Sequence, residues 1–404
     1  MSSFNSSIGL LLCFVALLLC IQSTWGEIRS IQKANPALLR RNSSFERQLS
    51  GGGKQSAMVT LLPGQYFQLD IEQREIDVAT TVFHPDGKQV EFDTPSGANG
   101  TESVRFIAAI GGDCRIEFRS LLKEVDPGRY RARVIALREA TAHDKLIVSA
   151  VVAQRHGDEL RAKPETRQKS VEQYETARKL WQSAGNPAGE ASAVRAIGFA
   201  WFRMGDSQKA IETFEKAAQL WHAAGEFRGE AFTYGTLGFV YERQNNSQKV
   251  LENNLRALPI WRRLRDAVQE AFTLSTIGDA YAKLGKKEES VGYCKRAINR
   301  SRDTRRRSIE AAVLRNCGQM LIAANDIAPA RGYLTKSLAL WRAANFKNNE
   351  AMTLTMLGEA SEKAGEKQQA IDYYLQAETI WKSLNEQSKG AEMKTRIARL
   401  HGTQ

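Results

Sequence analysis

The sequence predicts two folded parts: an N-terminal antiparallel β-sandwich and a C-terminal α-solenoid built from 40-residue helix pairs. Two observations lead to this fold class. In the second half, tryptophan recurs every forty residues, at Trp181, Trp221, Trp261, Trp341 and Trp381. A fixed period of this length indicates one helical unit stacked several times. Between about residues 55 and 140, apolar and polar residues alternate with period two, which is typical of half-buried strands.

The N-terminal segment has the pattern of a targeting sequence. Residues 8–21 are apolar without interruption, and the segment ends in Ser23-Thr24-Trp25-Gly26. This apolar run is short for a membrane-spanning helix. Residues 1–26 are therefore predicted to be a signal peptide of an exported protein, periplasmic or secreted. An uncleaved membrane anchor stays open as the alternative, because no Lys or Arg precedes the apolar run. Residues 27–54, polar and containing Gly51-Gly52-Gly53, are predicted to be a linker.

Residues 55–140 are predicted to form the β-sandwich. Alternating runs such as Tyr66–Ile71, Cys114–Phe118 and Tyr130–Ile135 are separated by turns rich in proline and glycine. About seven strands at this spacing favour an antiparallel sandwich. Two interpretations stay open for Asp86 and Asp93 near the turns: calcium ligands, or carboxylates exposed to solvent.

Residues 141–163 are predicted to be a connecting helix, and residues 164–402 the solenoid. Each unit contains a helix A and a helix B; the full units cover residues 186–225, 226–265, 266–305, 306–345 and 346–385. Within a unit, Gly198 is followed by Ala210 and Ala217, and this order recurs. Small residues let two helices approach closely. The tryptophans share a helical face with aromatic residues such as Phe214, so we expect them in the core.

This glycine–alanine–alanine order resembles the tetratricopeptide repeat, in a long form of forty residues. The segments that begin at Gly64 (GQYFQLDIEQREIDVATTVFHPDGK) and Pro127 (PGRYRARVIALREAT) resemble the N-terminal domain of certain exported bacterial proteins. In those proteins a sandwich similar to the pre-peptidase C-terminal domain precedes long tetratricopeptide repeats, and a CHAT-type peptidase domain often follows. The sequence given ends at Gln404, one helix after the last repeat, and contains no such peptidase domain.

The sequence shows no pattern of catalytic or metal-ligating residues. The five histidines are scattered, and no CxxC, phosphate-binding glycine loop or G-x-S-x-G motif occurs. We therefore expect no enzyme activity, cofactor or metal site. Cys294 and Cys317 fall in neighbouring helices, where both a bridge and buried free thiols stay open, the thiols being favoured. The formal charge of +12 is compatible with an anionic partner or with a basic surface exposed to solvent.

In a tetratricopeptide superhelix, helix A residues line the concave face, and this resemblance implies the partner-binding groove. A groove of mixed charge with a few aromatic residues suits an extended peptide or a partner helix. Its predicted residues are Arg195, Phe199, Phe202, Arg203, Phe239, Glu242, Arg243, Asp279, Lys283, Arg315, Asn316, Gln319 and Glu359. Asn316 fills one position of the carboxylate clamp of chaperone adaptors, but Ala196 and Met356 at equivalent positions do not. Capture of a C-terminal carboxylate is therefore not expected.

Three functions stay open. The first is a non-enzymatic exported scaffold that binds a protein or peptide in this groove, with no nucleic-acid partner. The second is a partner subunit or remnant of a CHAT-type peptidase system. The third is binding to an anionic surface through a basic cluster, which comprises Lys295, Arg296, Arg300, Arg302, Arg305, Arg306 and Arg307. At Ser301 the expected tryptophan is missing, so this junction is predicted to be the least stable of the array.

Overall fold

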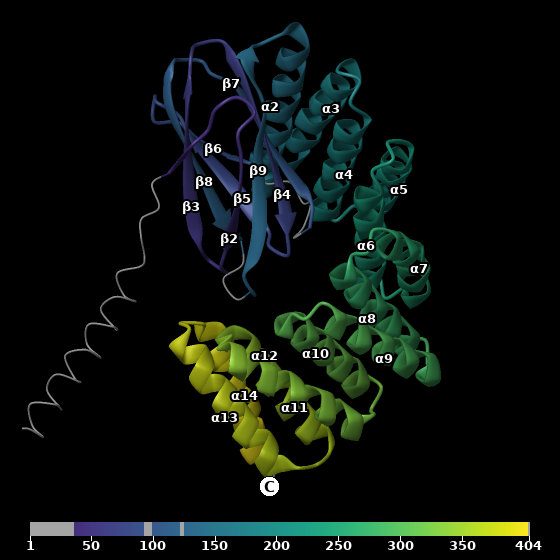
Figure 1. The fold of residues 1–404 in the computed structure, drawn as a ribbon. Coiled ribbons are helices and arrows are strands. Elements are labelled where there is room, and N and C mark those ends of the chain that lie inside the picture. Colours follow the sequence, from purple (N-terminus) through teal and green to yellow (C-terminus); the bar gives the residue numbers. More distant parts are fainter. Residues whose placement is uncertain (1–35, 93–98, 122–124, 403–404) are drawn as a thin grey trace, which may run out of the picture.

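The computed structural model describes residues 36–92, 99–121 and 125–402. The predicted signal peptide lies outside these residues, as does Asp93. None of the helices in the described ranges has the length and hydropathy needed to span a membrane. Figure 1 shows a β-rich part followed by a curved array of helices, so the predicted fold class is confirmed.

The N-terminal part consists of two sheets, with strand orders β1-β3-β8-β5-β6 and β2-β9-β4-β7. Apart from β1, which runs parallel to β3, neighbouring strands are antiparallel. The strands are β1 (Ala37–Leu38), β2 (Ser44–Leu49), β3 (Lys54–Leu61), β4 (Gln65–Arg74), β5 (Val78–Phe83), β6 (Gln89–Phe92), β7 (Thr101–Ile107), β8 (Gly112–Ser120) and β9 (Gly128–Glu139).

The linker predicted over residues 27–54 is wrong for its second half. Strand β2 lies inside it and pairs along its whole length with β9, from Ser44 opposite Arg133 to Leu49 opposite Gly128. The glycines that suggested flexibility form a tight turn into β3, where Gly52 adopts a φ of 68°. Glycine reaches this left-handed region at little cost, so the glycine run makes a hairpin turn here.

The two sheets enclose one apolar core, in which Phe67, Ile116, Phe118 and Tyr130 are fully buried. Tyr130 and Phe118 stack with ring centroids 5.0 Å apart. Helix α2 (Ala142–Ala162) continues directly from β9 and lies beside β7, with Val151 packed against the same core. The sandwich and the first helix of the array therefore share one hydrophobic core.

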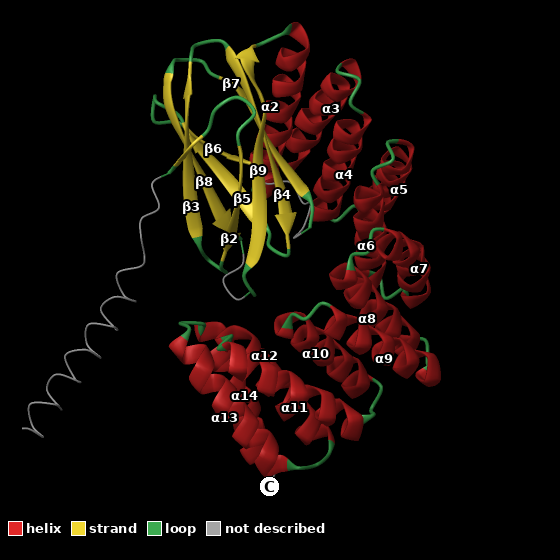
Figure 2. Cartoon of the chain, in the orientation of Figure 1, coloured by secondary structure: helices red, strands yellow, loops and turns green. Residues whose placement is uncertain are grey.

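The helices that follow form an antiparallel array (Figure 2). They are α3 (Arg167–Ser183), α4 (Pro187–Met204), α5 (Ser207–Ala223), α6 (Phe227–Arg243), α7 (Ser247–Arg263), α8 (Ala267–Lys283), α9 (Lys287–Asp303), α10 (Arg307–Ala323), α11 (Ile327–Ala344), α12 (Lys347–Lys363), α13 (Lys367–Ser383) and α14 (Gln387–Gly402). In Figure 1 the helices A, namely α4, α6, α8, α10 and α12, lie on the inner side of the curve. The helices B, such as α5, α7 and α9, lie on the outer side.

Close contact inside each pair depends on the repeated glycine. A Cβ atom at Gly198 would lie 2.7 Å from the ring of Phe214, and one at Gly358 would lie 2.4 Å from Tyr374. Gly157 of α2 has the same relation to Tyr174 of α3, at 2.5 Å. The predicted connecting helix therefore packs as the helix A of an additional pair. This pair extends the inner surface of the array by one helix.

The junctions between pairs are closed by the tryptophans and by the repeated glutamates. Trp181, Trp261, Trp341 and Trp381 are at most 5% exposed, so these indoles lie in the core as predicted, whereas Trp221 is only partly buried. At the start of each helix A, a glutamate accepts from the last turn of the preceding helix B. The donor–acceptor pairs are Gln182–Glu190, His222–Glu230, Arg262–Glu270, Arg302–Glu310 and Arg342–Glu350, at 2.5–3.0 Å.

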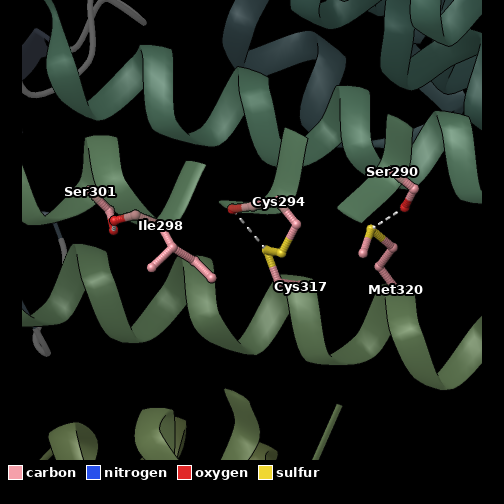
Figure 3. Close-up of a disulfide and its surroundings, with 6 residues drawn as sticks. All are labelled: Ser290, Cys294, Ile298, Ser301, Cys317 and Met320. Atoms are coloured by element: carbon pink, nitrogen blue, oxygen red, sulfur yellow. Dashed lines mark hydrogen bonds between the residues drawn. A yellow bond between two sulfur atoms is a disulfide. The ribbon is translucent and has the colours of Figure 1, made fainter. Parts of the chain in front are cut away.

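The junction that lacks a tryptophan has a disulfide instead (Figure 3). Cys294 of α9 is bridged to Cys317 of α10, so the prediction of buried free thiols is wrong for these two residues. Both are 1% exposed. Ser301 is fully buried, and its hydroxyl donates to the carbonyl of Ile298 at 2.7 Å. The bridge therefore ties together the two helices that meet without an indole between them.

The free end of the sandwich touches the array at the turns that precede α8 and α10. Asp126, in the loop before β9, accepts from the hydroxyl of Ser308 at the start of α10, and Arg306 donates to its carbonyl at 3.2 Å. Asn99 donates to Asp266 at 3.4 Å. Beside this contact lies a polar cavity of about 530 Å³, bordered by the sandwich and by these turns. The β-rich part therefore rests on one edge of the helical array.

Candidate partner-binding groove

The predicted groove residues form rows along the inner helices. On α4, Arg195, Phe199 and Arg203 are spaced four residues apart, so their side chains lie on one helical face. Phe239 and Arg243 continue this pattern on α6. The aromatic and basic residues Phe199 and Arg203 of α4, and Phe239 and Arg243 of α6, lie in the C-terminal half of their helices. The sandwich contacts the turns before helices A, which is the opposite edge of the array.

Two phenylalanines of adjacent units meet on this inner surface. The ring centroids of Phe202 and Phe239 lie 5.7 Å apart in an edge-to-face arrangement. Phe239 is 50% exposed, which is unusual for a side chain of this size within a repeat array. Phe199, also on α4, packs against the core residue Phe214, with centroids 5.0 Å apart. The first two units therefore present an aromatic surface that the array itself does not cover.

The cations around this surface lack carboxylate partners. The side chains of Arg203 and Arg243 are exposed and form no ion pair or hydrogen bond within the described part of the chain. Arg195 is only 8% exposed, and its guanidinium carbon lies 5.5 Å from the centroid of Phe199. Burial, with the nearby charge of Arg161, lowers the pKa of Arg195 to about 10. Arg195 therefore remains a cation at neutral pH.

In the third unit the predicted residues neutralise one another. Lys283 binds Asp279 at 2.7 Å and Glu242 of the preceding inner helix at 2.8 Å. Burial alone would lower the pKa of Lys283, but these two carboxylates outweigh it and raise the pKa. A cavity of about 290 Å³ lies beside this triad, lined by Glu242, Asp279 and Lys283 together with the start of α7. The charges here hold adjacent helices together.

In the last units, too, predicted polar groove residues have partners within the chain. Arg315 donates to Asn349 at 2.7 Å and lies over Trp341, and burial lowers the pKa of its guanidinium. Glu359 binds Arg396 of the final helix α14 at 2.7 Å, so its charge is neutralised within the array. Asn316 is half-buried and Gln319 exposed on the same helix as Arg315. The groups free to receive a partner are therefore concentrated in the first two units.

The sequence reasoning missed the contribution of α2 to the inner surface. Arg161 and Asp158 lie there, paired at 3.1 Å, and Arg161 also donates to Tyr174 at 3.0 Å. The guanidinium carbon of Arg161 lies 5.9 Å from the centroid of Phe199, on the same ring that Arg195 approaches. The signal that identifies α2 as an inner helix is Gly157 followed by Tyr174, the same small–aromatic pair as Gly198 and Phe214.

The predicted basic cluster is partly neutralised. Arg300 binds Glu270 at 2.7 Å, Arg302 binds Glu310 at 2.8 Å, and Arg306 lies 3.7 Å from the carboxylate of Asp126. These residues serve the junctions of the array and its contact with the sandwich. Lys295, Arg305 and Arg307 are exposed and form no ion pair in the described ranges. The cluster therefore has fewer unpaired positive charges for binding an anionic surface than its sequence suggests.

The described residues contain no group of three or more histidine, cysteine, aspartate or glutamate side chains arranged to hold a metal ion. Asp86, one of the two candidate calcium ligands, accepts from the backbone of Lys88 at 3.1 Å and pairs with its ammonium group at 3.4 Å. The backbone hydrogen bond, followed by the Lys88 side chain, lowers the pKa of Asp86. Its turn therefore satisfies this carboxylate locally.

Comparison with known proteins places the array in a class. Residues 190–263 and 269–343 match a tetratricopeptide repeat model. The helical array therefore contains tetratricopeptide repeats over these residues, and an N-terminal β-rich region of two sheets precedes it. Repeats of this kind are associated with binding of protein or peptide partners. No curated protein matches the sequence significantly.

Solved structures resemble part of the chain at low sequence identity. RapI in its apo form is 16% identical with a TM-score of 0.52, over 63% of this chain and 70% of that chain. BtubC from P. vanneervenii is 18% identical with a TM-score of 0.45, over 61% of this chain and 93% of that chain. A Rap protein complexed with Competence and Sporulation Factor is 11% identical with a TM-score of 0.41, over 65% and 77%. At these identities the likeness concerns the fold alone.

Proposed function

We propose that the protein is a non-enzymatic, exported scaffold that binds a protein or peptide partner on the inner surface of its first two full units. One observation carries this proposal: Arg203 and Arg243 are exposed and unpaired beside the aromatic pair of Phe202 and Phe239. Further along the array, Lys283 at the equivalent position is paired with Asp279 and Glu242. Aromatic and arginine side chains are enriched among the residues that dominate binding energy at protein interfaces.

The proposal of export is supported by two features. The apolar segment of residues 8–21 has the length of a signal-peptide core. The bridge between Cys294 and Cys317 is of a kind that persists in oxidising compartments outside the cytosol. The mass of the intact native protein tests this proposal: it is expected to match residues 27–404 with one disulfide. A native mass that includes residues 1–26 would show that this segment is not cleaved.

Selection of random displayed peptides on the full-length protein tests the groove. Peptides enriched on the wild type are expected to lose binding to the double variant Arg203→Glu/Arg243→Glu, because the reversed charges sit beside the aromatic surface. The control is Lys216→Glu/Lys336→Glu, which makes the same charge change at exposed positions of the outer helices α5 and α11. Enriched peptides that bind both double variants as tightly as the wild type would exclude this surface as the binding site.

A further inference from the structure

Arg195 is a buried cation whose charge the chain does not balance. It lies in the middle of α4 and is 8% exposed. Its neighbour Arg161 has its own partners, Asp158 at 3.1 Å and Tyr174 at 3.0 Å. Both guanidinium groups flank the ring of Phe199, at 5.5 and 5.9 Å. Arg195 itself forms no hydrogen bond or ion pair with the described residues. The pair of Arg161 and Asp158 is neutral together, so one positive charge remains uncompensated.

The same chain shows how this position is satisfied elsewhere. Arg315 occupies the equivalent position of α10, three repeats later, and donates to Asn349 of the next inner helix at 2.7 Å. The residue that corresponds to Asn349 beside Arg195 is Gly229, which has no side chain. A Cβ atom at Gly229 would lie 2.4 Å from the indole of Trp221. The local packing therefore excludes the kind of acceptor that the fifth unit supplies to Arg315.

The side chain of Arg195 is mostly buried, but none of its nitrogens is fully shielded from solvent, so a ligand can reach the guanidinium group. A charge that has lost most of its water without gaining a counter-ion is costly. A carboxylate fits a guanidinium group through two parallel hydrogen bonds, and this pairing is among the stronger polar contacts in proteins. The inner surface continues past Arg195 on both sides, to Arg161 on α2 and to Phe239 on α6. A bound chain would therefore pass over Arg195, which favours a side-chain carboxylate over a C-terminal one.

We propose that Arg195 binds the carboxylate of an aspartate or glutamate in the partner segment, while an adjacent apolar residue of that segment packs on Phe239. This inference rests on the proposed function and specifies its ligand: an acidic segment that also carries aromatic or aliphatic residues. The exposed arginines Arg203 and Arg243 attract such a segment by its net charge. Arg195 selects it by a fixed hydrogen-bonding geometry in a largely desolvated position.

The test uses the full-length protein and labelled synthetic peptides with blocked termini, followed by fluorescence anisotropy. One peptide alternates glutamate with phenylalanine, a second has glutamine for each glutamate, and a third is the glutamine peptide with a free C-terminal carboxylate. The glutamate peptide is expected to bind at least about tenfold more tightly than the other two. The variant Arg195→Met is expected to lose this preference, and Arg195→Lys to retain part of it, since lysine keeps the charge without the planar fork. Arg296→Met, an exposed change on the outer helix α9, is expected to change nothing.

The unbound protein gives a second, independent readout. Because Arg195→Met removes an uncompensated buried charge, its melting temperature without peptide is expected to rise. A fall in the melting temperature would show that Arg195 is satisfied inside the fold, and it would overturn the inference. Equal binding of the glutamate and glutamine peptides by the wild type would also overturn it while leaving the groove intact. If no peptide binds and display enriches none, the proposed function itself fails.

Discussion

Asp144 fixes the connection between the sandwich and the helical array. It is 3% exposed, closes the capping box of α2 with Thr141, and accepts from Arg138 of β9 at 2.5 and 3.0 Å. Burial alone would raise the pKa of this carboxyl group. The hydrogen bonds from Arg138 and Thr141 outweigh burial and lower the pKa to about 2. The charged form of Asp144 therefore stabilises the folded state.

The consequence is a defined loss of stability in acid. An unfolded aspartate has a pKa of about 3.9, so the contribution of Asp144 is fully present above about pH 4. It is lost as the pH falls through about 2, the folded pKa. We expect the loss to be about 1–2 kcal/mol, because solvent screens the partly exposed Arg138. Unfolding free energies of the wild type and Asp144→Asn, measured against pH, are expected to converge between pH 4 and 2. Parallel curves would contradict this assignment.

At the same scale, the repeat register predicted which residues are core and which line the inner surface, because helical spacing fixes the face of each position. Buried Trp261 and Trp381 confirm the first prediction. The register could not predict which surface charges stay free. Lys283 is paired because Glu242 happens to lie one helix away, whereas Arg243 has no such neighbour. Such pairings depend on the separation of adjacent helices, which no single-helix pattern contains.

Among the elements, α9 and α10 are joined differently from the other neighbours. Their junction lacks the indole and is closed by the bridge between Cys294 and Cys317, whose Cα atoms are 5.8 Å apart. Closing a loop of this length stabilises by about 3 kcal/mol in the chain-entropy model. The double variant Cys294→Ala/Cys317→Ala is therefore expected to unfold its C-terminal helices at lower urea concentration. The prediction that the junction of α9 and α10 is the least stable of the array is therefore tested in the protein without this disulfide.

A reductant supplies the control for this prediction. In urea titrations followed by circular dichroism, the reducing agent is expected to shift the wild-type transition toward that of the double variant. It is expected to leave the double variant unchanged, because Cys114, the other cysteine of the described residues, is not bridged. If the reductant shifts both proteins equally, or if alkylation detects free Cys294 and Cys317 in the native protein, the bridge does not stabilise this junction.

Element boundaries in the solenoid were predictable because each unit repeats its glycines and caps. The strand boundaries of the sandwich were less predictable, and β2 shows why. Its residues alternate Phe45, Arg47 and Leu49 with polar neighbours, but a triple glycine follows, which in isolation resembles a linker. Only its pairing with β9, more than eighty residues later in the chain, identifies it as a strand. Pairing over such a distance leaves no local signal in the sequence.

At the scale of the whole molecule, the contact between sandwich and array was the feature least accessible from sequence. Asp126 and Ser308 are separated by 182 residues, and neither belongs to a repeated pattern of charges. Helix α10 lacks an N-cap side chain of its own, since Arg306 occupies that position. Asp126 supplies the missing acceptor: the backbone N–H of Ser308 lies 3.4 Å from its carboxylate. A carboxylate at a helix N-terminus satisfies free N–H groups and interacts favourably with the helix dipole.

This geometry makes Asp126 a cap provided by a different part of the molecule, so its loss is expected to affect both partners. We expect Asp126→Ala to destabilise the first turn of α10 by about 1 kcal/mol, the usual cost of a lost N-cap. Hydrogen exchange is expected to accelerate in that turn and in the turn at Asp266, where Asn99 makes the second contact. Small-angle scattering is expected to show a larger radius of gyration, because the sandwich is then held to the array mainly through α2.

Two variants separate this effect from a general loss of charge or stability. Asp86→Ala removes a carboxylate from a turn of the same sandwich that pairs only with Lys88, and it is expected to leave α10 unchanged. Ser308→Ala removes the donor on the other side of the contact. If the docked arrangement holds in solution, Asp126→Ala and Ser308→Ala are expected to be non-additive, because either change breaks the same bond. Additive effects on the exchange of α10, with an unchanged radius of gyration, would mean that the sandwich does not cap this helix.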